Sequence, residues 1–226
     1  SGTSGRLGVL DAVECPPTFS TTNEVTGLIA GGYEAFVQAK EGAEDNEELG
    51  ATDIVNAGVT GKDVVIGLAA SGRTPHTIGA LKKANEIGAV TVSIACNPDS
   101  EIGKVAKLAI DLNTGPEVLT GSTRLKAGTA QKMVLNMIST ASMIGVGKTY
   151  QNLMVDVKPS NAKLVERGKR IIMEATDCEY TTAEKAFEES GRNPKTAIVM
   201  ILLQCDYATA KERLEKGNHF IKNAIK

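Results

Sequence analysis

Residues 64–81, VVIGLAASGRTPHTIGAL, constrain the fold most, because the hydrophobic pattern changes its period there across a few small residues. Val64 to Leu68 form a nearly continuous apolar run, which is typical of a strand buried on both faces of a parallel sheet. Pro75 then predicts a helix start, since proline lacks the N–H that the first helical position leaves unpaired. The turn between them offers backbone N–H groups, two hydroxyls and the positive end of a helix dipole, which suit a phosphate. Taken alone, an ordinary strand-to-helix connection has the same features.

Two further stretches of the chain have the same small, hydroxyl-bearing character. Residues 1–8, SGTSGRLG, lead into a helical pattern of apolar residues, and residues 119–126, LTGSTRLK, precede a long apolar helix. Three such loops in one α/β chain favour anion binding over three ordinary connections.

The composition narrows the classes of function. With 226 residues, of which 42% are hydrophobic and 23% charged, the chain can bury a substantial core. No apolar run reaches the length of a membrane span and no secretory signal is recognisable, although the start looks truncated. A net charge of −2 gives no electrostatic reason to expect nucleic acid. We therefore expect neither a membrane nor a nucleic acid as partner, whereas a small anionic ligand needs only local donors.

The cysteines indicate neither a metal site nor a disulfide framework. They are far apart in the sequence and show no CxxC or Cys/His spacing: Cys15, Cys96, Cys178 and Cys205. We expect no metal and no cofactor, and reduced thiols in a cytoplasm are the default.

The order of elements predicts a parallel sheet covered by helices. We expect strands at 25–30, 64–68, 90–95 and 107–112, and helices at 4–13 (stopped by Pro16 and Pro17), at 33–39, from Leu49, from Pro75 and at 122–144. Alternating strands and helices favour coverage of both faces, with ligands beyond the carboxyl ends of the strands. The three hydroxyl-rich loops fall at such ends, which would place them on one side of the sheet.

The chain changes character after Tyr150. Four stretches have helical spacing with no strand between them: residues 161–175, 182–190, 196–204 and 208–216. We therefore predict two domains, residues 1–165 built on the sheet and residues 166–226 as a small helical bundle. Nothing in the second domain resembles a catalytic cluster, so packing or oligomerisation is its expected role.

Several motifs, taken together, resemble one family. They are GTSGRLGVLDAVECPPTF (2–19), EGAED (41–45), AASGRTP (69–75), CNPDS (96–100), LTGSTRLKAGTAQKMVLNMIST (119–140) and GKTYQNLMVDV (147–157). Over its whole length the chain is similar to the N-acetylmuramic acid 6-phosphate etherases of the sugar isomerase (SIS) superfamily. The resemblance implies a SIS-type, flavodoxin-like three-layer α/β/α sandwich. It also implies a preceding segment, with helices and the first strand of the sheet, that we expect to be missing here.

The resemblance implies a lyase that cleaves the D-lactyl ether of N-acetylmuramic acid 6-phosphate during peptidoglycan recycling in bacterial cytoplasm. Its products would be N-acetylglucosamine 6-phosphate and D-lactate. An ether oxygen β to an aldehyde can leave by elimination once the adjacent C2 proton is removed, and ring opening supplies that aldehyde. Water then adds to the unsaturated intermediate. This route needs a carboxylate base at C2 and an acid for the departing oxygen at C3, and it needs no metal.

By resemblance, Glu14 in ECPPT and Glu44 in EGAED are the catalytic acid and base. Glu14 lies between an apolar helix and the Pro-Pro corner, where partial burial would raise its pKa and keep it protonated as the acid. Glu44 would then be the base, although which glutamate has which role is left open. Without the resemblance, each would be interpreted as a solvated surface residue, Glu44 within an acidic patch.

The resemblance also implies the phosphosugar-binding residues. They are Ser4, Ser71, Gly72, Thr74, Ser122, Thr123 and Lys126. Weaker cationic candidates are Arg6, Arg73 and Arg124. His76 is assigned a surface or dimer role, and Asn97 and Asp99 are expected to shape their turn. Since SIS domains commonly pair so that one subunit completes the other's site, we expect a homodimer with a shared active site.

Two alternative functions remain open. A SIS chain can be a non-catalytic regulator that binds phosphosugar, as glucokinase regulatory protein does. It can also be an aldose–ketose isomerase, which abstracts the same C2 proton without expelling an ether substituent. The two glutamates in their motifs argue against the regulator, and the ECPPT and EGAED motifs argue against a generic isomerase.

Overall fold

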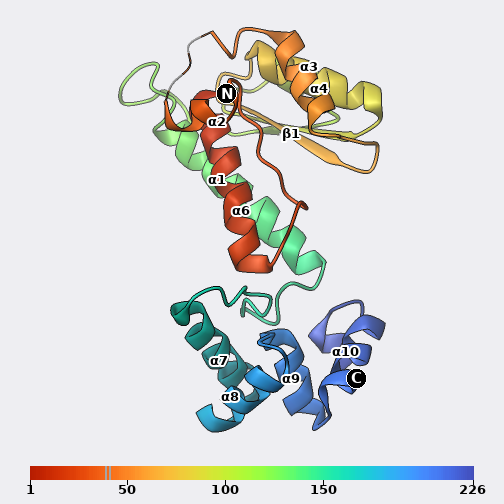
Figure 1. Ribbon diagram of the computed structural model, residues 1–226. Helices are drawn as coiled ribbons and strands as arrows, with labels where there is room; N and C mark the ends of the chain where they lie inside the picture. Colours follow the sequence, from red (N-terminus) through yellow and green to blue (C-terminus); the bar gives the residue numbers. More distant parts are fainter. Residues whose placement is uncertain (39, 41) are drawn as a thin grey trace. The chain divides into compact units, whose positions relative to one another are not determined.

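The computed structural model of the chain describes residues 1–38, 40 and 42–226 (Figure 1). Ala39, the expected end of the short helix, and Glu41, the first residue of the EGAED motif, lie outside the described residues. The helices and strands are α1 (Gly2–Phe19), α2 (Gly32–Val37), α3 (Glu47–Asn56), β1 (Val64–Ala69), α4 (Pro75–Ile87), β2 (Val90–Ala95), α5 (Glu101–Val105), β3 (Leu108–Asp111), α6 (Lys126–Gly145), α7 (Ala162–Thr176), α8 (Tyr180–Glu189), α9 (Pro194–Leu203), α10 (Tyr207–Lys216) and α11 (Ile221–Ala224).

The chain forms two compact units. The first unit consists of Ser1–Val13 and Thr26–Met137, and the second consists of Glu14–Val25 and Ile138–Lys226. The long helices α1 and α6 contribute residues to both units. The first unit contains the sheet, and the second contains α7 to α11.

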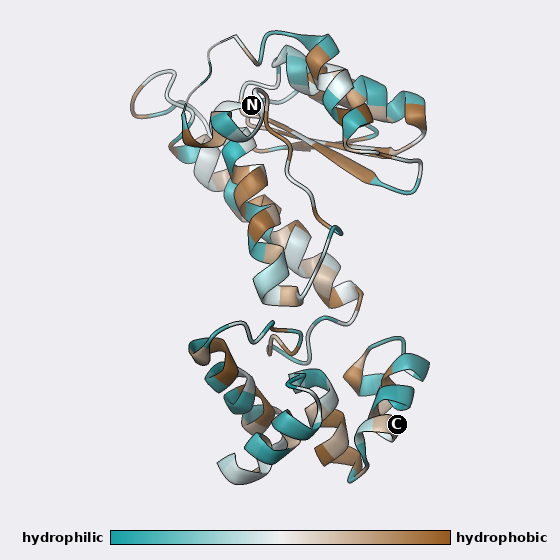
Figure 2. Ribbon diagram, in the orientation of Figure 1, coloured by the Kyte–Doolittle hydropathy of each residue, from teal (hydrophilic) through white to brown (hydrophobic). Residues whose placement is uncertain are grey.

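The sheet of the first unit has, within the described residues, three parallel strands in the order β1, β2, β3. Strand β1 pairs with β2 from Val64 opposite Val90, and β2 pairs with β3 from Val92 opposite Leu108. Figure 2 shows hydrophobic residues along the strands, and Ile94 of the central strand is fully buried. The strand predictions for β1, β2 and β3 and the helix start after β1 are therefore confirmed.

Helices cover both faces of this sheet. On one face, a Cβ added at Gly67 would lie 2.8 Å from Leu81 and 2.9 Å from Thr77, so α4 rests directly on β1. On the other face, the next strand residue, Leu68, lies 3.3 Å from the Cβ position of Gly8 in α1. Helices α3 and α4 lie side by side on the first of these faces (Figure 1). The predicted three-layer α/β/α architecture is confirmed.

Helices α1 and α6 run parallel to each other on the second face. Thr3 lies 3.5 Å from the Cβ position of Gly128, and further along both helices Asn136 donates to the Asp11 carboxylate at 2.6 Å. Ala127, in the first turn of α6, belongs to a buried cluster with residues that directly follow β1 and β2. The three hydroxyl-rich loops therefore gather at the carboxyl edge of the sheet.

The predicted end of the first helix is wrong. Helix α1 continues through Pro16 and Pro17 and ends at Phe19, where the N–H of Ser20 donates to the Pro16 carbonyl at 2.9 Å. Proline in a last turn removes only its own donors and does not prevent the turn from closing. Burial of Cys15 and Phe19 in one cluster stabilises this turn.

The predicted strand at residues 25–30 is also wrong. This segment is irregular and, among the described residues, pairs with no strand. A Cβ at Gly27 would lie 2.6 Å from the Cα atom of Val9, and Ile29 lies 2.8 Å from the Cβ position of Gly5. The segment thus lies against α1 instead of extending the sheet.

The second unit is a helical bundle with its own core. Phe187, Ile172 and Ile198 are fully buried in one cluster, which also includes the segment Leu153–Val157. Helix α9 is buried from Pro194 to Met200. The four helices predicted for this region are confirmed as α7, α8, α9 and α10, with small shifts at their ends. No helix in the described part of the chain combines the length and apolarity needed to span a membrane.

Candidate active site

The turn Ser71–Thr74 joins β1 to α4 at the carboxyl edge of the sheet. Its start is held by the neighbouring strand, because the Cys96 N–H donates to the Ala70 carbonyl at 2.9 Å. The Asn97 side chain donates to the same carbonyl at 3.1 Å, so Asn97 shapes this edge as expected. Asp99 has φ +53°, which fits a tight turn after β2.

Gly72 gives this turn its shape. Its φ is +69°, and a Cβ there would lie 2.2 Å from the Cβ atom of Ser100, so no other residue fits without movement. The Gly72 carbonyl accepts the N–H of Ile102 at 3.0 Å. The Ser71 hydroxyl accepts the Arg73 N–H at 3.3 Å, which folds the turn back on itself.

The N-terminus of α4 presents groups that suit an anion. Thr74 is the N-cap residue, and among the described residues its half-buried side chain makes no capping hydrogen bond. Pro75 follows at the first helical position. The hydroxyls of Ser71 and Thr74 therefore lie at the positive end of a 13-residue helix, a position that favours phosphate.

Glu44 is attached to the same helix end. Its carbonyl accepts the N–H of His76 at 3.0 Å, and its side chain is exposed. The carboxylate oxygen Oε2 lies 3.8 Å from the Cβ position of Gly2, in the first turn of α1. Glu44 thus contacts both helix N-termini, α4 through its carbonyl and the first turn of α1 through its carboxylate.

Ser4 is placed at the same edge but is already hydrogen-bonded. Its hydroxyl donates to the Gln131 side chain at 2.7 Å, and the two residues are 6% and 0% exposed. Gln131 in turn donates to the Ile94 carbonyl at 3.4 Å. Sequence analysis missed Gln131, since a glutamine in an apolar helix gives no local sign of its partner.

Glu117 occupies the N-terminus of α6. Its carboxylate accepts the backbone N–H groups of Lys126 at 2.9 Å and Ala127 at 3.0 Å, and these bonds lower the pKa of the carboxyl group. Sequence analysis also missed this residue. In the same loop, Ser122 is half-buried and Thr123 is exposed. The helix N-terminus after the third hydroxyl-rich loop is therefore already occupied by the Glu117 carboxylate.

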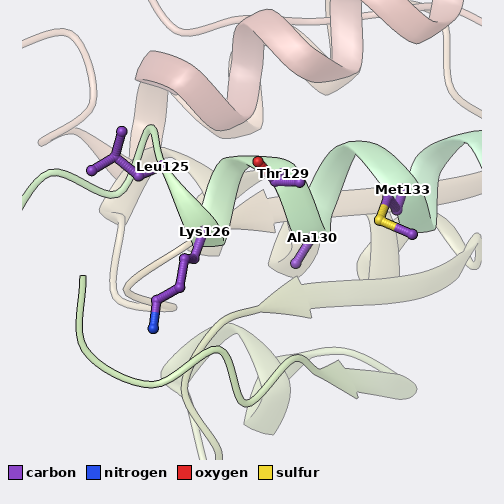
Figure 3. A pocket seen from close by; sticks show the side chains of 5 residues that line it. All are labelled: Leu125, Lys126, Thr129, Ala130 and Met133. Carbon is purple, nitrogen blue, oxygen red and sulfur yellow. The ribbon is translucent and has the colours of Figure 1, made fainter. Parts of the chain in front are cut away.

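An open cavity of about 500 Å³ lies along α6. It is lined by Leu125, Lys126, Thr129, Ala130 and Met133, and Figure 3 shows the first-turn lysine and Ala130 projecting from the same side of the helix. Of the predicted site residues, Lys126 lines this cavity.

Glu14 belongs to the second unit, whereas Glu44 belongs to the first. Glu14 lies on α1 beside Cys15, which is buried with Phe19 and Met143, whereas Glu14 itself is exposed. The expected partial burial of Glu14 is therefore wrong, because the continued helix turns its neighbours inward instead. Because Glu14 is exposed, burial no longer supports its role as the acid, and the assignment of acid and base stays open.

Two residues have positions that the sequence did not predict. His76 is 7% exposed and its Nε2 lies 2.9 Å from Oδ2 of Asp53, so the expected surface position is wrong: α3 covers this side of α4. Arg6 donates to the carbonyls of Ala35 and Phe36 at 2.9 Å each, at the carboxyl end of α2. Arg73 and Arg124 are exposed.

Comparison with known protein families agrees with this geometry. The SIS domain family model matches residues 44–141, and the model of the glucokinase regulatory protein N-terminal SIS domain matches residues 1–85. Together with the SIS match, the three-layer fold identifies a SIS domain in this chain.

Relatives that match nearly the whole chain narrow this class. The N-acetylmuramic acid 6-phosphate etherase of Oceanobacillus iheyensis is 63% identical over 225 residues, which cover 99% of this chain and 76% of the relative. The enzymes of the same name from a Geobacillus strain and from Bacillus cereus are 64% and 62% identical and are covered over 77% of their length. The chain belongs to the N-acetylmuramic acid 6-phosphate etherase family.

Proposed function

We propose that this chain is a carbon–oxygen lyase that cleaves the D-lactyl ether of N-acetylmuramic acid 6-phosphate in the recycling of peptidoglycan amino sugars. The products are N-acetylglucosamine 6-phosphate and D-lactate. Family membership over 99% of the chain supports the reaction. The single structural observation that carries the proposal is the attachment of Glu44 to the N-terminus of α4, beside the turn that suits a phosphate.

The 6-phosphate binds at the Ser71–Thr74 turn. The hydroxyls of Ser71 and Thr74 donate to its oxygens, and Gly72 allows the backbone to approach them. Ser4, Ser122, Thr123 and Lys126 contribute to sugar binding at the same edge, where Ser4 must exchange its present partner for the ligand. Substituting Ser71 by Ala and Thr74 by Val should raise KM more than it lowers kcat, because the phosphate does not react.

Glu14 and Glu44 supply the proton transfers of the elimination. One carboxylate removes the C2 proton of the open-chain sugar, and one carboxylic acid protonates the lactate oxygen that leaves C3. Water then adds at C3 of the unsaturated aldehyde, which restores the hydroxyl of the amino sugar. Each group can reverse its protonation state over the two half-reactions, so two glutamates are sufficient.

Release of D-lactate from the phosphosugar tests the reaction. Glu14→Gln and Glu44→Gln should each lower kcat by about 100-fold or more, since a general acid or base contributes about 10²–10⁴-fold. Glu48→Gln, a matched loss of an exposed carboxylate in the neighbouring helix, should leave kcat unchanged. In ¹⁸O-labelled water, the label should appear in the amino sugar and not in lactate. Full activity of both glutamate variants, or label in lactate, would refute the mechanism.

A homodimer is part of this proposal, and the outer face of α6 supports it. Ala127, Gln131 and Leu135 form the buried face of the helix, yet Met133 and Met137 on another side are 53% and 58% exposed. Met133 lines the open cavity along α6 and Met137 lies one turn further along the helix, and large exposed apolar side chains there favour a partner surface. A second copy of the chain fits because a two-fold axis lets the same face of α6 serve both subunits.

Mixing two inactive variants tests whether the subunits share a site. Glu14→Gln and Glu44→Gln homodimers are unfolded together, refolded and assayed for D-lactate release. If each site takes one glutamate from each subunit, half of the dimers are mixed and half of their sites are intact, which restores about a quarter of wild-type activity. If both glutamates of a site come from one chain, mixing restores nothing. A monomer in sedimentation analysis would refute the dimer itself.

A phosphosugar-binding regulator is the second candidate, because the regulatory-protein SIS model matches residues 1–85. The decisive comparison is binding without turnover. If N-acetylmuramic acid 6-phosphate raises the Tm but no D-lactate appears, the chain is a regulator.

We place the enzyme in the cytoplasm, where its phosphorylated substrate would be formed and retained, and cell fractionation checks this.

A further inference from the structure

His76 is contacted by one continuous stretch of chain, residues 44–53, through three different groups. Its backbone N–H donates to the Glu44 carbonyl at 3.0 Å. Its ring Nε2 lies 2.9 Å from Oδ2 of Asp53. Its carbonyl oxygen lies 1.9 Å from the Cβ position of Gly50, so the two backbones are in direct contact. The stretch that carries Glu44 is therefore fixed to a single residue at both of its ends and in its middle.

The packing around His76 leaves little room for adjustment. His76 is 7% exposed, and a second glycine contact repeats the close approach one turn later, where the Cβ position of Gly79 lies 1.9 Å from the Glu47 carbonyl oxygen. Two helices that meet backbone to backbone have no flexible side chains between them to absorb a shift. A displacement of α3 must therefore move Glu44 relative to α4.

His76 is also tied to the proposed phosphate turn. It follows Thr74 by two residues, and the intervening Pro75 fixes its own φ near −65°. The turn is held on its other side by Ser100 and Ile102, whose contacts with Gly72 do not involve α3. His76 is thus the residue at which the phosphate turn and the Glu44 segment are joined.

We propose that His76, through Asp53, is a positioning residue for the lyase reaction: it sets where the Glu44 carboxylate stands relative to the bound phosphosugar. The expected loss of kcat rests on the proposed function, whereas the expected shift of the Glu44 segment relative to α4 does not. Misplacing a catalytic group by about 1 Å can cost about 100-fold in rate. Binding of the phosphate should persist, because the Ser71–Thr74 turn provides it. Loss of the ring contact should therefore lower kcat and spare KM.

Three variants distinguish an effect on the position of the Glu44 carboxylate from a general loss of stability. His76→Phe keeps the ring volume and loses the bond to Asp53, and it should lower kcat by about 10- to 100-fold with KM within about threefold of wild type. His76→Gln places an amide N–H near the former Nε2 and should recover much of the loss. Thr77→Val is the matched control, since Thr77 is equally buried on the next position of α4 but lies against Gly67 of the sheet. It should leave kcat unchanged.

Asp53→Ala removes the same contact from the other side. Because one bond is deleted in either case, the double variant Asp53→Ala with His76→Phe should be no slower than the worse single variant. Additive losses in kcat would overturn the proposal, and so would a His76→Phe enzyme that loses Tm but retains kcat at a temperature where it is folded.

Amide hydrogen exchange without substrate tests the structural link independently of catalysis. In His76→Phe, peptides covering residues 42–56 should exchange faster than in wild type, while those covering 90–95 of the central strand should not. Unchanged exchange in residues 42–56 would overturn the proposal. If exchange rises as expected but the wild-type protein releases no D-lactate, the proposed function fails and the link between α3 and α4 stands.

Discussion

Asp156 and Lys195 form a buried ion pair in the second unit, and we expect removal of one charge to lower the free energy of unfolding more than removal of both. Oδ2 of Asp156 lies 2.5 Å from Nζ of Lys195 and 3.8 Å from Nζ of Lys148, and the side chains of Asp156 and Lys195 are 10% and 8% exposed. Burial lowers the pKa of the Lys195 ammonium despite its contact with Asp156, so desolvation of this cation outweighs the attraction of the pair. Each partner is therefore tolerated in the interior mainly because the other is present.

Removing one partner should cost more than removing both. Asp156→Ala leaves the buried Lys195 without a counter-ion, and breaking a buried pair in this way costs about 3–5 kcal/mol. Lys195→Met leaves Asp156 with Lys148 nearby, so its cost should be smaller, about 1–3 kcal/mol. Asp156→Leu combined with Lys195→Met removes both desolvation penalties and should come within about 1–2 kcal/mol of wild type.

Urea unfolding followed by circular dichroism measures these differences. For a chain of this size, the Asp156→Ala variant should also melt roughly 6–20 °C lower than wild type. Lys185→Met, which removes an exposed pair with Glu189, is the control and should change the free energy of unfolding by less than about 1 kcal/mol. A double substitution that costs as much as the sum of the single ones would refute the reasoning, because it would mean that the two charges act independently.

Two further perturbations test the first unit. Glu117→Gln should destabilise it at neutral pH, since the folded pKa of Glu117 lies below its ordinary 4.5; the stabilisation is present above that pH and is lost as the pH falls through the folded pKa. Urea midpoints of wild type and variant should then converge in acid, and a gap that persists there contradicts the cap. Gly50→Ala should cost about 1–3 kcal/mol by overpacking, because its Cβ would meet the His76 carbonyl oxygen at 1.9 Å. Gly145→Ala, at a helical position with nothing within 4 Å among the described residues, should be neutral or stabilise by up to about 1 kcal/mol, and equal costs at both glycines would contradict the close contact.

The sheet was predictable because its signals are local. Strand β1 is a nearly continuous apolar run, β2 is rich in β-branched residues, and Pro75 and Gly88 mark the two ends of the helix between them. The failures lie where tertiary packing overrides a local rule. Pro16 and Pro17 read as a stop signal, but the burial of Cys15 beside them keeps the turn helical.

The site was predictable in part for the same reason. The turn that carries Ser71 and Thr74 was predicted from a strand end and a helix start that adjoin each other in sequence. The position of His76 depends on Asp53, 23 residues earlier, and the environment of Ser4 depends on Gln131, 127 residues later. Neither pair changes the local sequence pattern, so hydrophobic periodicity and turn residues cannot predict either contact.

The three hydroxyl-rich loops illustrate the limit of composition as a guide to function. Each lies at a helix N-terminus, so the dipole argument applies to all of them equally. At α6 the carboxylate of Glu117 already accepts the first N–H groups, and a phosphate would have to displace one negative charge with another. At α1 the Ser4 hydroxyl donates a buried hydrogen bond to the Gln131 side chain. At α4 the N-cap residue Thr74 makes no capping bond among the described residues, and the His76 N–H is paired with the neutral Glu44 carbonyl, so an incoming anion displaces no carboxylate there. That difference, invisible in sequence, is why we propose the turn to which Glu44 is attached as the phosphate site.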